Sequence, residues 1–336
     1  MMQVAVFNTK AFDREFLEPQ FEAVALEPIF FEARLCEETI SMAKGFEVVS
    51  AFVNDDLNGK VIWGLAGLGC KLVALRCAGF NNVDIEKAND IGIQIVRVPE
   101  YSPQAVAEHT FGLILALNRR IHRAHNRVRE GNFSLDGLLG FDLARSTIGV
   151  VGTGKIGSCV ARIASGFGSK VLLHDRHESP ELVQYGAYCS LEQLFARSDI
   201  VTLHCPLTPE THHLIDGDVI SAMQSGVMLI NTSRGGLVDT KAIIRGLKSK
   251  KIGALGLDVY EEEADLFFVD HSESILQDDT FSRLLTFPNV LITSHQAFFT
   301  RDALEEIAST TANSIHLWTK GKTIPTDRLC TCVSHL

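Results

Sequence analysis

A glycine-rich turn in the middle of the chain constrains the fold more than any other feature. Residues 147–151 form an apolar, β-branched run typical of a buried strand, and Gly152, Gly154 and Gly157 follow it in the spacing G-x-G-x-x-G. A helical pattern and a second apolar run come next, and Asp175 ends that run. Glycine-rich turns also occur in other α/β proteins, but this complete order favours a βαβ unit that binds a dinucleotide pyrophosphate at the start of its helix.

The acid at the end of the second run indicates which dinucleotide is bound. Asp175 can accept hydrogen bonds from ribose hydroxyls and repels a 2′-phosphate, so the sequence predicts NAD as the cofactor, with NADH as its reduced form. Arg176 and His177 follow directly, and both can pair with a 2′-phosphate. Some tolerance of NADP is therefore left open.

The composition argues against several classes of partner. The net charge of −10 disfavours nucleic acid and anionic membranes as partners. No apolar run reaches transmembrane length and no secretory signal is present, so we expect a cytoplasmic protein that binds no membrane. The eight cysteines include no C-x-x-C pair and are expected to be reduced thiols. A disulfide or metal site at Cys330 and Cys332 is the alternative, but we expect no metal.

The alternation of apolar runs and helical patterns predicts the α/β fold class. Strands are expected at 3–7, 46–53, 71–76 and 93–98, and again after the glycine turn at 199–204, 227–231, 254–258 and 290–293. Helical stretches between strands indicate two doubly wound parallel sheets, of which only the second has a phosphate-binding turn. A last helix over 300–319 is expected to return to the first domain. The expected domains are thus 1–101 with 299–336, and 102–298, with a cleft between them.

A basic run follows the helix that should begin at Pro103 after the N-cap residue Ser102. Seven arginines and histidines lie within 119–129 of an otherwise acidic protein. An anion or effector site would explain this run, but a solvated or inter-subunit helix face explains it more simply.

Three strand ends carry groups suited to chemistry. Arg234 follows one strand and can hold a carboxylate with two parallel hydrogen bonds, although a surface ion pair is the alternative. His295 follows another, and a carboxylate beside it would orient the ring and favour the imidazolium. Such a histidine can act as a general acid and base. The candidate carboxylates are Glu261, Glu262 and Glu263, and the residues alone do not say which one pairs with His295.

These segments resemble a known family over nearly the whole chain. The resemblance is to the D-2-hydroxyacid dehydrogenases, most closely the bacterial fermentative D-lactate dehydrogenases. The segments that carry it are 51–56, 75–84, 105–109, 152–157, 203–208, 231–235, 257–263, 265–268 and 295–298.

The resemblance implies a role for each of these groups. Arg234 would bind the substrate carboxylate, Glu263 would be the partner of His295, and His295 would be the acid and base. Further cofactor contacts are implied at Lys155, Ile156, Asp175, His204, Cys205, Pro206, Thr211, Thr232, Ser233 and Asp258. Substrate contacts are implied at Ala78, Gly79, Tyr101 and Phe298. The family has a flavodoxin-like substrate domain made of both chain ends and a Rossmann-type NAD-binding domain, and it pairs subunits through the latter.

The implied reaction is reversible, NADH-dependent reduction of pyruvate to D-lactate by a homo-dimer or homo-tetramer. Phe52, Tyr101, Phe298 and Phe299 favour a small apolar substituent on the 2-keto acid. Hydroxypyruvate, glyoxylate and larger 2-keto acids are the alternatives within the family. The alternative that is not an enzyme is an NADH-sensing binding protein similar to a corepressor. We disfavour it because the sequence shows no long disordered tail and no basic targeting segment.

Overall fold

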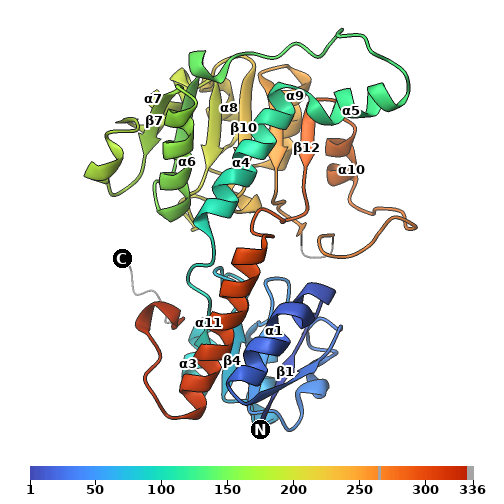
Figure 1. The fold of residues 1–336 in the computed structure, drawn as a ribbon, viewed down its shortest axis with the longest axis vertical. Coiled ribbons are helices and arrows are strands. Elements are labelled where there is room, and N and C mark those ends of the chain that lie inside the picture. The colour runs from blue at the N-terminus through green and yellow to red at the C-terminus, as the bar shows by residue number, and fades with distance from the viewer. Residues whose placement is uncertain (264–265, 331–336) are drawn as a thin grey trace. The chain divides into compact units, whose positions relative to one another are not determined.

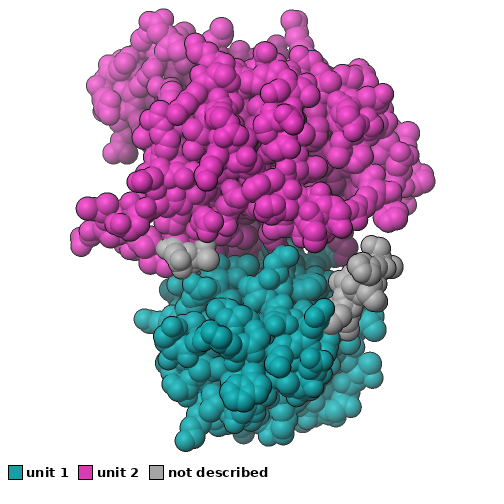
Figure 2. Space-filling model, turned by 180° about the vertical axis from the view of Figure 1, so that it is seen from behind, with its two compact units in different colours: residues 1–102, 299–336 teal, residues 103–298 magenta. Residues whose placement is uncertain are grey.

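The chain folds into two compact units. The computed structural model describes residues 1–263 and 266–330. Unit 1 comprises Met1–Ser102 and Phe299–Leu336, and unit 2 comprises Pro103–Phe298, as coloured in Figure 2. The chain ends therefore share one unit, and the glycine turn lies in the other. Cys332 and Asp265, which the sequence analysis mentions, lie outside the described residues.

Unit 1 is built on a five-stranded parallel sheet with the order β2-β1-β3-β4-β5. This is the flavodoxin-like order. The prediction of a parallel α/β domain at this end of the chain is confirmed. The strands are β1 (Met2–Val6), β2 (Leu26–Phe30), β3 (Val48–Ala51), β4 (Leu72–Leu75) and β5 (Gln94–Val96).

The sequence analysis missed strand β2. Its sequence places Glu27 and Pro28 between apolar residues, which interrupts the pattern of a strand. β2 is an edge strand, where proline is tolerated because one side of the strand needs no ladder hydrogen bond. The structure therefore has a strand where only helix was expected.

Helices cover both faces of the unit 1 sheet. Leu17 and Phe21 of α1 pack with Ala308 and Ile315 of α11 in one core, and α2 and α3 contribute to the core on the other face. The helix after residue 300 thus lies beside α1, as Figure 1 shows. The helices are α1 (Ala11–Ala23), α2 (Gly59–Gly67), α3 (Ile85–Ile91) and α11 (Arg301–Thr319), with short 3-10 turns η1 (Ile40–Ala43) and η6 (Thr326–Arg328).

A buried ion pair ties α1 to the sheet of unit 1. The Arg76 side chain is 1% exposed and donates from Nε to Asp13 Oδ1 over 3.1 Å, where the Asp13 side chain is 6% exposed. Arg76 also donates to Ser50 Oγ and to the carbonyl of Phe7. The guanidinium therefore joins the carboxyl ends of β1, β3 and β4 to the first turn of α1.

Unit 2 contains a seven-stranded parallel sheet with the order β12-β11-β10-β9-β6-β7-β8. Counted from β6, this is the Rossmann order with one further strand. The predicted second parallel domain is therefore confirmed, and the sheet also contains the short edge strand β8, which the sequence analysis did not predict. The strands are β6 (Thr147–Val151), β7 (Lys170–His174), β8 (Ala187–Tyr188), β9 (Ile200–Leu203), β10 (Val227–Asn231), β11 (Ile252–Leu257) and β12 (Val290–Ile292).

The unit 2 sheet is covered by α4 and α6 on one face and by α7, α8, α9 and α10 on the other. The basic run forms a separate helix, α5, because the chain turns at Arg120 with a φ of +50°. None of the helices in the described ranges combines the length and apolarity needed to cross a bilayer. The helices are α4 (Pro103–Asn118), α5 (Ile121–Arg129), α6 (Lys155–Gly166), α7 (Leu191–Arg197), α8 (Gly217–Ala222), α9 (Thr240–Lys248) and α10 (Asp279–Leu285), with 3-10 turns η2 (Leu143–Arg145), η3 (Pro180–Leu182) and η4 (Gly235–Leu237).

We predict that Arg76→Met destabilises unit 1 by about 3–5 kcal/mol, because it leaves the Asp13 carboxylate buried without its partner. Urea unfolding followed by tryptophan fluorescence measures this loss, since Trp63 and Trp318 both lie in unit 1. The control Lys71→Met removes an exposed ion pair with Glu47 and should cost about 0–1 kcal/mol. Equal effects of the two variants would contradict a stabilising role of the buried pair.

Candidate active site

The glycine turn after β6 leaves room for a ligand at the start of α6. Gly152 has a φ of +89°, and a Cβ there would lie 2.5 Å from the Cys205 nitrogen. A Cβ on Gly157 would overlap the Gly152 carbonyl oxygen, so this glycine lets the helix pack on the turn. A Cβ on Gly154 would meet no atom within 4 Å. The helix begins at Lys155, so its first N–H groups face this open space.

Asp175 lies beside the turn as a carboxylate. Its Oδ2 accepts the Thr153 N–H over 2.5 Å and the Thr153 hydroxyl over 3.2 Å, and its Oδ1 accepts the His177 N–H over 3.1 Å. Burial alone would raise the pKa of Asp175, but these hydrogen bonds outweigh it and hold the pKa below its usual value. A stable negative charge at this position matches ribose hydroxyls and opposes a 2′-phosphate.

His204 brings a neutral ring to the same edge of the sheet. Burial lowers the pKa of His204 to about 3, so the ring carries no charge at neutral pH. Its Nε2 contacts Thr202 Oγ1 at 2.7 Å, and its Nδ1 is buried with no hydrogen-bond partner among the described residues. This unpaired nitrogen fits a site that is completed by a bound ligand.

The segments after β9 and β10 are joined by hydrogen bonds. The Ser233 hydroxyl donates to the Cys205 carbonyl over 2.8 Å, and Thr211 Oγ1 donates to the Pro206 carbonyl over 2.7 Å. Thr232 Oγ1 lies 3.0 Å from Thr110 Oγ1 of α4. The predicted cofactor residues of these two segments therefore lie together with the glycine turn. Such a set fits a dinucleotide, with the pyrophosphate at the α6 start and the ribose at Asp175.

Hydrogen bonds to backbone groups position Arg234, and no ion pair within the described residues does so. The Asn231 side chain donates to the Arg234 carbonyl over 2.8 Å and accepts the Ser233 N–H over 3.0 Å. The Arg234 guanidinium donates to the Ser233 carbonyl over 2.7 Å, and no carboxylate of the described chain pairs with it. Within the described residues, its remaining N–H groups are therefore left to hold an anionic ligand.

Asp258 organises the loop that follows β12. Its side chain is 1% exposed, and its Oδ1 accepts the Thr293 hydroxyl over 2.5 Å and the Gln296 N–H over 2.9 Å, while Oδ2 accepts the Ala297 N–H over 2.8 Å. His109 Nε2 lies 3.4 Å from Oδ1. Burial would raise the pKa of Asp258, but His109, Thr293 and the backbone donors together lower it. Asp258 is also one of the predicted cofactor contacts, and within the protein both of its oxygens accept hydrogen bonds.

His295 and Glu263 form a close pair. His295 Nδ1 lies 2.7 Å from Glu263 Oε1, and the two side chains are 15% and 18% exposed. Because a carboxylate accepts hydrogen bonds, Nδ1 carries the proton and Nε2 is left for other contacts. Glu263 is fixed in turn by the Tyr260 N–H, which donates to Oε2 over 2.9 Å. His295 has a φ of +53°, an uncommon conformation that the Asp258 carbonyl supports by accepting the His295 N–H over 2.7 Å.

The contacts also separate the three candidate glutamates. Glu261 pairs with His213 and Thr240, and Glu263 pairs with His295. The residues alone could not make this distinction, because it depends on how the loop after β11 turns. Thr293 and His109 were missed as site residues, and no spacing signal marks them.

Two of the predicted substrate residues of unit 1, Ala78 and Gly79, lie in the loop after β4. Arg97 Nη1 donates to the Ala78 carbonyl over 2.8 Å, and the Cys77 thiol donates to the Gly79 carbonyl over 3.2 Å. Tyr101 is half-buried near the end of the first segment of unit 1, and Phe298 is buried at the end of unit 2.

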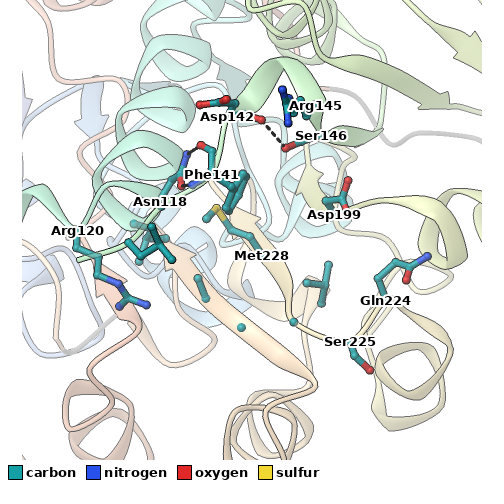
Figure 3. Close-up of a pocket in the computed structure, with 17 residues that line it drawn as sticks. Asn118, Arg120, Phe141, Asp142, Arg145, Ser146, Asp199, Gln224, Ser225 and Met228 are labelled. Atoms are coloured by element: carbon teal, nitrogen blue, oxygen red, sulfur yellow. Dashed lines mark hydrogen bonds between the residues drawn. The ribbon is translucent and has the colours of Figure 1, made fainter. Parts of the chain in front are cut away.

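A cavity of about 630 Å³ lies elsewhere in unit 2 (Figure 3). Its lining includes Ser146, which precedes β6, Asp199, which precedes β9, and Val227, the first residue of β10. These are the amino ends of the strands, whereas parallel α/β sheets bind ligands at the carboxyl ends. The cavity is therefore distinct from the residues gathered around the glycine turn.

Comparison with known proteins agrees with this geometry. The family model for the D-isomer specific 2-hydroxyacid dehydrogenase, NAD binding domain, matches residues 111–297. The chain is 49% identical to a D-lactate dehydrogenase of Escherichia coli over 97% of this chain and 99% of the relative.

Two solved structures are also similar over most of their length. The pyruvate reductase of Chlamydomonas reinhardtii is 44% identical with a TM-score of 0.91, covering 97% of this chain and 98% of that one. A D-lactate dehydrogenase from Aquifex aeolicus, complexed with NAD and lactic acid, is 36% identical with a TM-score of 0.85, covering 95% and 96%. The matching family model, these identities and the nucleotide site of unit 2 together show the family. The chain belongs to the NAD-dependent D-isomer specific 2-hydroxyacid dehydrogenases.

Proposed function

We propose that this enzyme reduces pyruvate to D-lactate with NADH, and catalyses the reverse reaction with NAD. The single observation that carries the proposal is the pair formed by His295 Nδ1 and Glu263 Oε1, which leaves Nε2 without a partner among the described residues. Arg234, in the same unit, has no carboxylate partner among those residues. The names of similar proteins, a D-lactate dehydrogenase and a pyruvate reductase, support the choice of substrate.

Arg234 is proposed to bind the substrate carboxylate. Its guanidinium has no carboxylate partner in the described chain, and a planar fork of N–H groups matches a carboxylate with two parallel hydrogen bonds. The proposed contacts of unit 1 are the backbone of Ala78 and Gly79, with Tyr101. Unit 1 is accordingly proposed as the substrate domain.

His295 is proposed to move the proton. When bound, the reduced cofactor supplies a hydride to the carbonyl carbon. Protonated His295 gives its Nε2 proton to the carbonyl oxygen, and neutral His295 takes that proton back during hydroxy-acid oxidation. Glu263 keeps the ring oriented through Nδ1 and stabilises its positive charge.

The proposed cofactor contacts are those gathered at the carboxyl edge of the unit 2 sheet. Lys155 and Ile156 begin α6, where backbone N–H groups would hold the phosphates. Asp175 would accept the ribose hydroxyls, and His204 Nδ1 would meet the cofactor. Asp258 is proposed to act mainly through the loop that carries His295.

Selection of a small substrate is proposed to come from aromatic side chains. Phe299 is 50% exposed and packs edge-on against Phe12 with ring centroids 5.0 Å apart in unit 1. Phe52, also expected near the substrate, is 4% exposed and lies under the Arg76 guanidinium. Phe52 and Phe298, which are 4% and 6% exposed, therefore offer little surface, and Tyr101 and Phe299 are the better candidates.

We predict that His295→Gln lowers the rate of pyruvate reduction by about 10²–10⁴-fold, because the proton donor is lost, while NADH affinity changes little. Steady-state rates, chiral analysis of the lactate and an NADH fluorescence titration measure these quantities. The control His271→Gln removes a histidine that contacts Ser274 away from this pair, and should behave as wild type. A near-normal rate in His295→Gln, or L-lactate as the wild-type product, would contradict the proposal.

We predict that Asp175→Asn shifts the preference from NADH toward NADPH by roughly 10–100-fold in kcat/KM, because the charge that repels a 2′-phosphate is removed while a hydrogen-bond acceptor remains for Thr153. The matched control is Glu178→Gln, which removes an exposed carboxylate of the same loop. An equal change in both variants would assign the effect to overall charge and not to Asp175.

We propose that a second copy of the chain covers the arm, defined as residues 121–141. The arm includes α5 and, in Figure 1, the segment that arcs back over unit 2 toward β6. Leu135 and Leu139 are 82% and 91% exposed, and Phe133 is 74% exposed. The Asn118 side chain accepts the Phe141 N–H and donates to the Phe141 carbonyl, over 2.9 Å each (Figure 3). These two hydrogen bonds anchor the end of the arm. An anchored, exposed apolar surface of this kind indicates a protein interface.

We predict that the double variant Leu135→Asp, Leu139→Asp reduces the solution mass to that of one chain, because charges would be buried at the interface. Sedimentation equilibrium or light scattering measures the mass. Val183→Asp changes another exposed apolar residue of unit 2 and should leave the assembly intact. An unchanged mass in the double variant would exclude the arm as the interface.

A further inference from the structure

Three side chains of the kinds that ligate metals lie together away from the proposed reaction groups. His212, His213 and Glu261 offer ligand atoms that all lie within 4.8 Å of one another. The two histidines belong to the loop after β9, and Glu261 belongs to the loop after β11. We propose that these side chains bind one divalent transition-metal ion, for which Zn²⁺ is the best match. The sequence analysis expected no metal. It did not single out His212, His213 and Glu261, which belong to two loops that are far apart along the chain.

Glu261 is fixed in the way that a metal-ligating carboxylate usually is. Its Oε2 accepts the Thr240 hydroxyl over 2.6 Å and the Thr240 N–H over 3.2 Å, at the first turn of α9. These contacts aim Oε1 at His213, whose Nε2 lies 2.6 Å away. Hydrogen bonds to the second oxygen of a ligating carboxylate orient it and are a common part of metal sites.

His212 adds a donor that the pair of His213 and Glu261 does not use. The two histidine rings are stacked, with centroids 3.9 Å apart and planes inclined by 25°. His212 is exposed, and the His213 and Glu261 side chains are 37% and 24% exposed, so an ion can reach the cluster. A hydrogen-bonded pair needs only two of these groups, whereas a metal site uses all three.

The distances fit a zinc site after small side-chain movements. With bonds of about 2.0–2.1 Å, tetrahedral zinc ligands lie roughly 3.3 Å from one another. Glu261 Oε1 and His213 Nε2, now 2.6 Å apart, must separate slightly while His212 moves inward. The proton shared by the pair leaves to solvent as the ion binds. Two imidazoles, one carboxylate and one water would then complete a four-coordinate site.

The ion would connect segments that lead into the reaction site. Glu261 is followed two residues later by Glu263, the partner of His295. The His213 N–H donates to the Gly236 carbonyl over 2.8 Å, just after Arg234. The site is nevertheless separate from the proposed reaction groups, and its occupancy can be measured without any turnover.

Zinc binding to the full chain tests the proposal. Protein stripped with a chelator and then dialysed is titrated with Zn²⁺ in competition with a chromophoric chelator. We expect one ion per chain, and an affinity at least about tenfold lower in His212→Ala and in Glu261→Gln. Co²⁺ should give the visible absorption of a four-coordinate N/O site in the wild type, and that absorption should be lost in both variants.

The controls separate this site from adventitious binding. His212→Ala changes an exposed side chain and should keep the wild-type thermal melting curve, so it stays informative if Glu261→Gln folds poorly. His125→Ala removes an exposed histidine of α5 and should bind zinc as the wild type does. Wild-type zinc affinity in His212→Ala, or no stoichiometric zinc binding by the wild type, would overturn the proposal.

Discussion

The site depends on the hydrogen bonds that the buried carboxylate of Asp258 accepts. A charge that is 1% exposed is costly unless it is paired, so the Thr293 hydroxyl and the N–H groups of Gln296 and Ala297 are held close to it. Holding those donors fixes the loop that carries His295. The left-handed backbone of His295, which costs of order 1–3 kcal/mol, is tolerated because the surrounding hydrogen bonds outweigh that cost.

Two polar groups of unit 2 keep unused hydrogen-bonding capacity among the described residues, and they match the proposed substrate. Glu263 occupies Nδ1 of His295, which leaves Nε2 for a carbonyl or hydroxyl oxygen. The Arg234 guanidinium bonds only the Ser233 carbonyl within the described chain, which leaves N–H groups for a carboxylate. A 2-keto acid presents both kinds of acceptor on adjacent carbons. The chemistry therefore follows from which side chains the protein leaves unpaired, as much as from which it pairs.

The sequence predicted the features that depend on local backbone geometry. The glycine spacing at 152–157 and the apolar runs of the central strands specify backbone shape directly, so the two parallel sheets were predicted correctly. β2 was missed because Pro28 interrupts its pattern, which only an edge position allows. The residues could not choose between Glu261 and Glu263, since both follow β11 and only tertiary contacts separate them. The resemblance to a family supplied Glu263. The cluster of His212, His213 and Glu261 left no sequence signal, because it joins two distant loops.

The tautomer of neutral His295 tests the central chemistry most directly. In protein labelled with ¹⁵N-histidine, and with His295→Gln to assign the signals, nitrogen NMR distinguishes a protonated Nδ1 from a protonated Nε2. The contact with Glu263 predicts that the proton resides on Nδ1, with Nε2 bare and ready to accept the substrate proton. A proton on Nε2 in the neutral ring would contradict this account, because the acid–base nitrogen would then be the one facing the carboxylate.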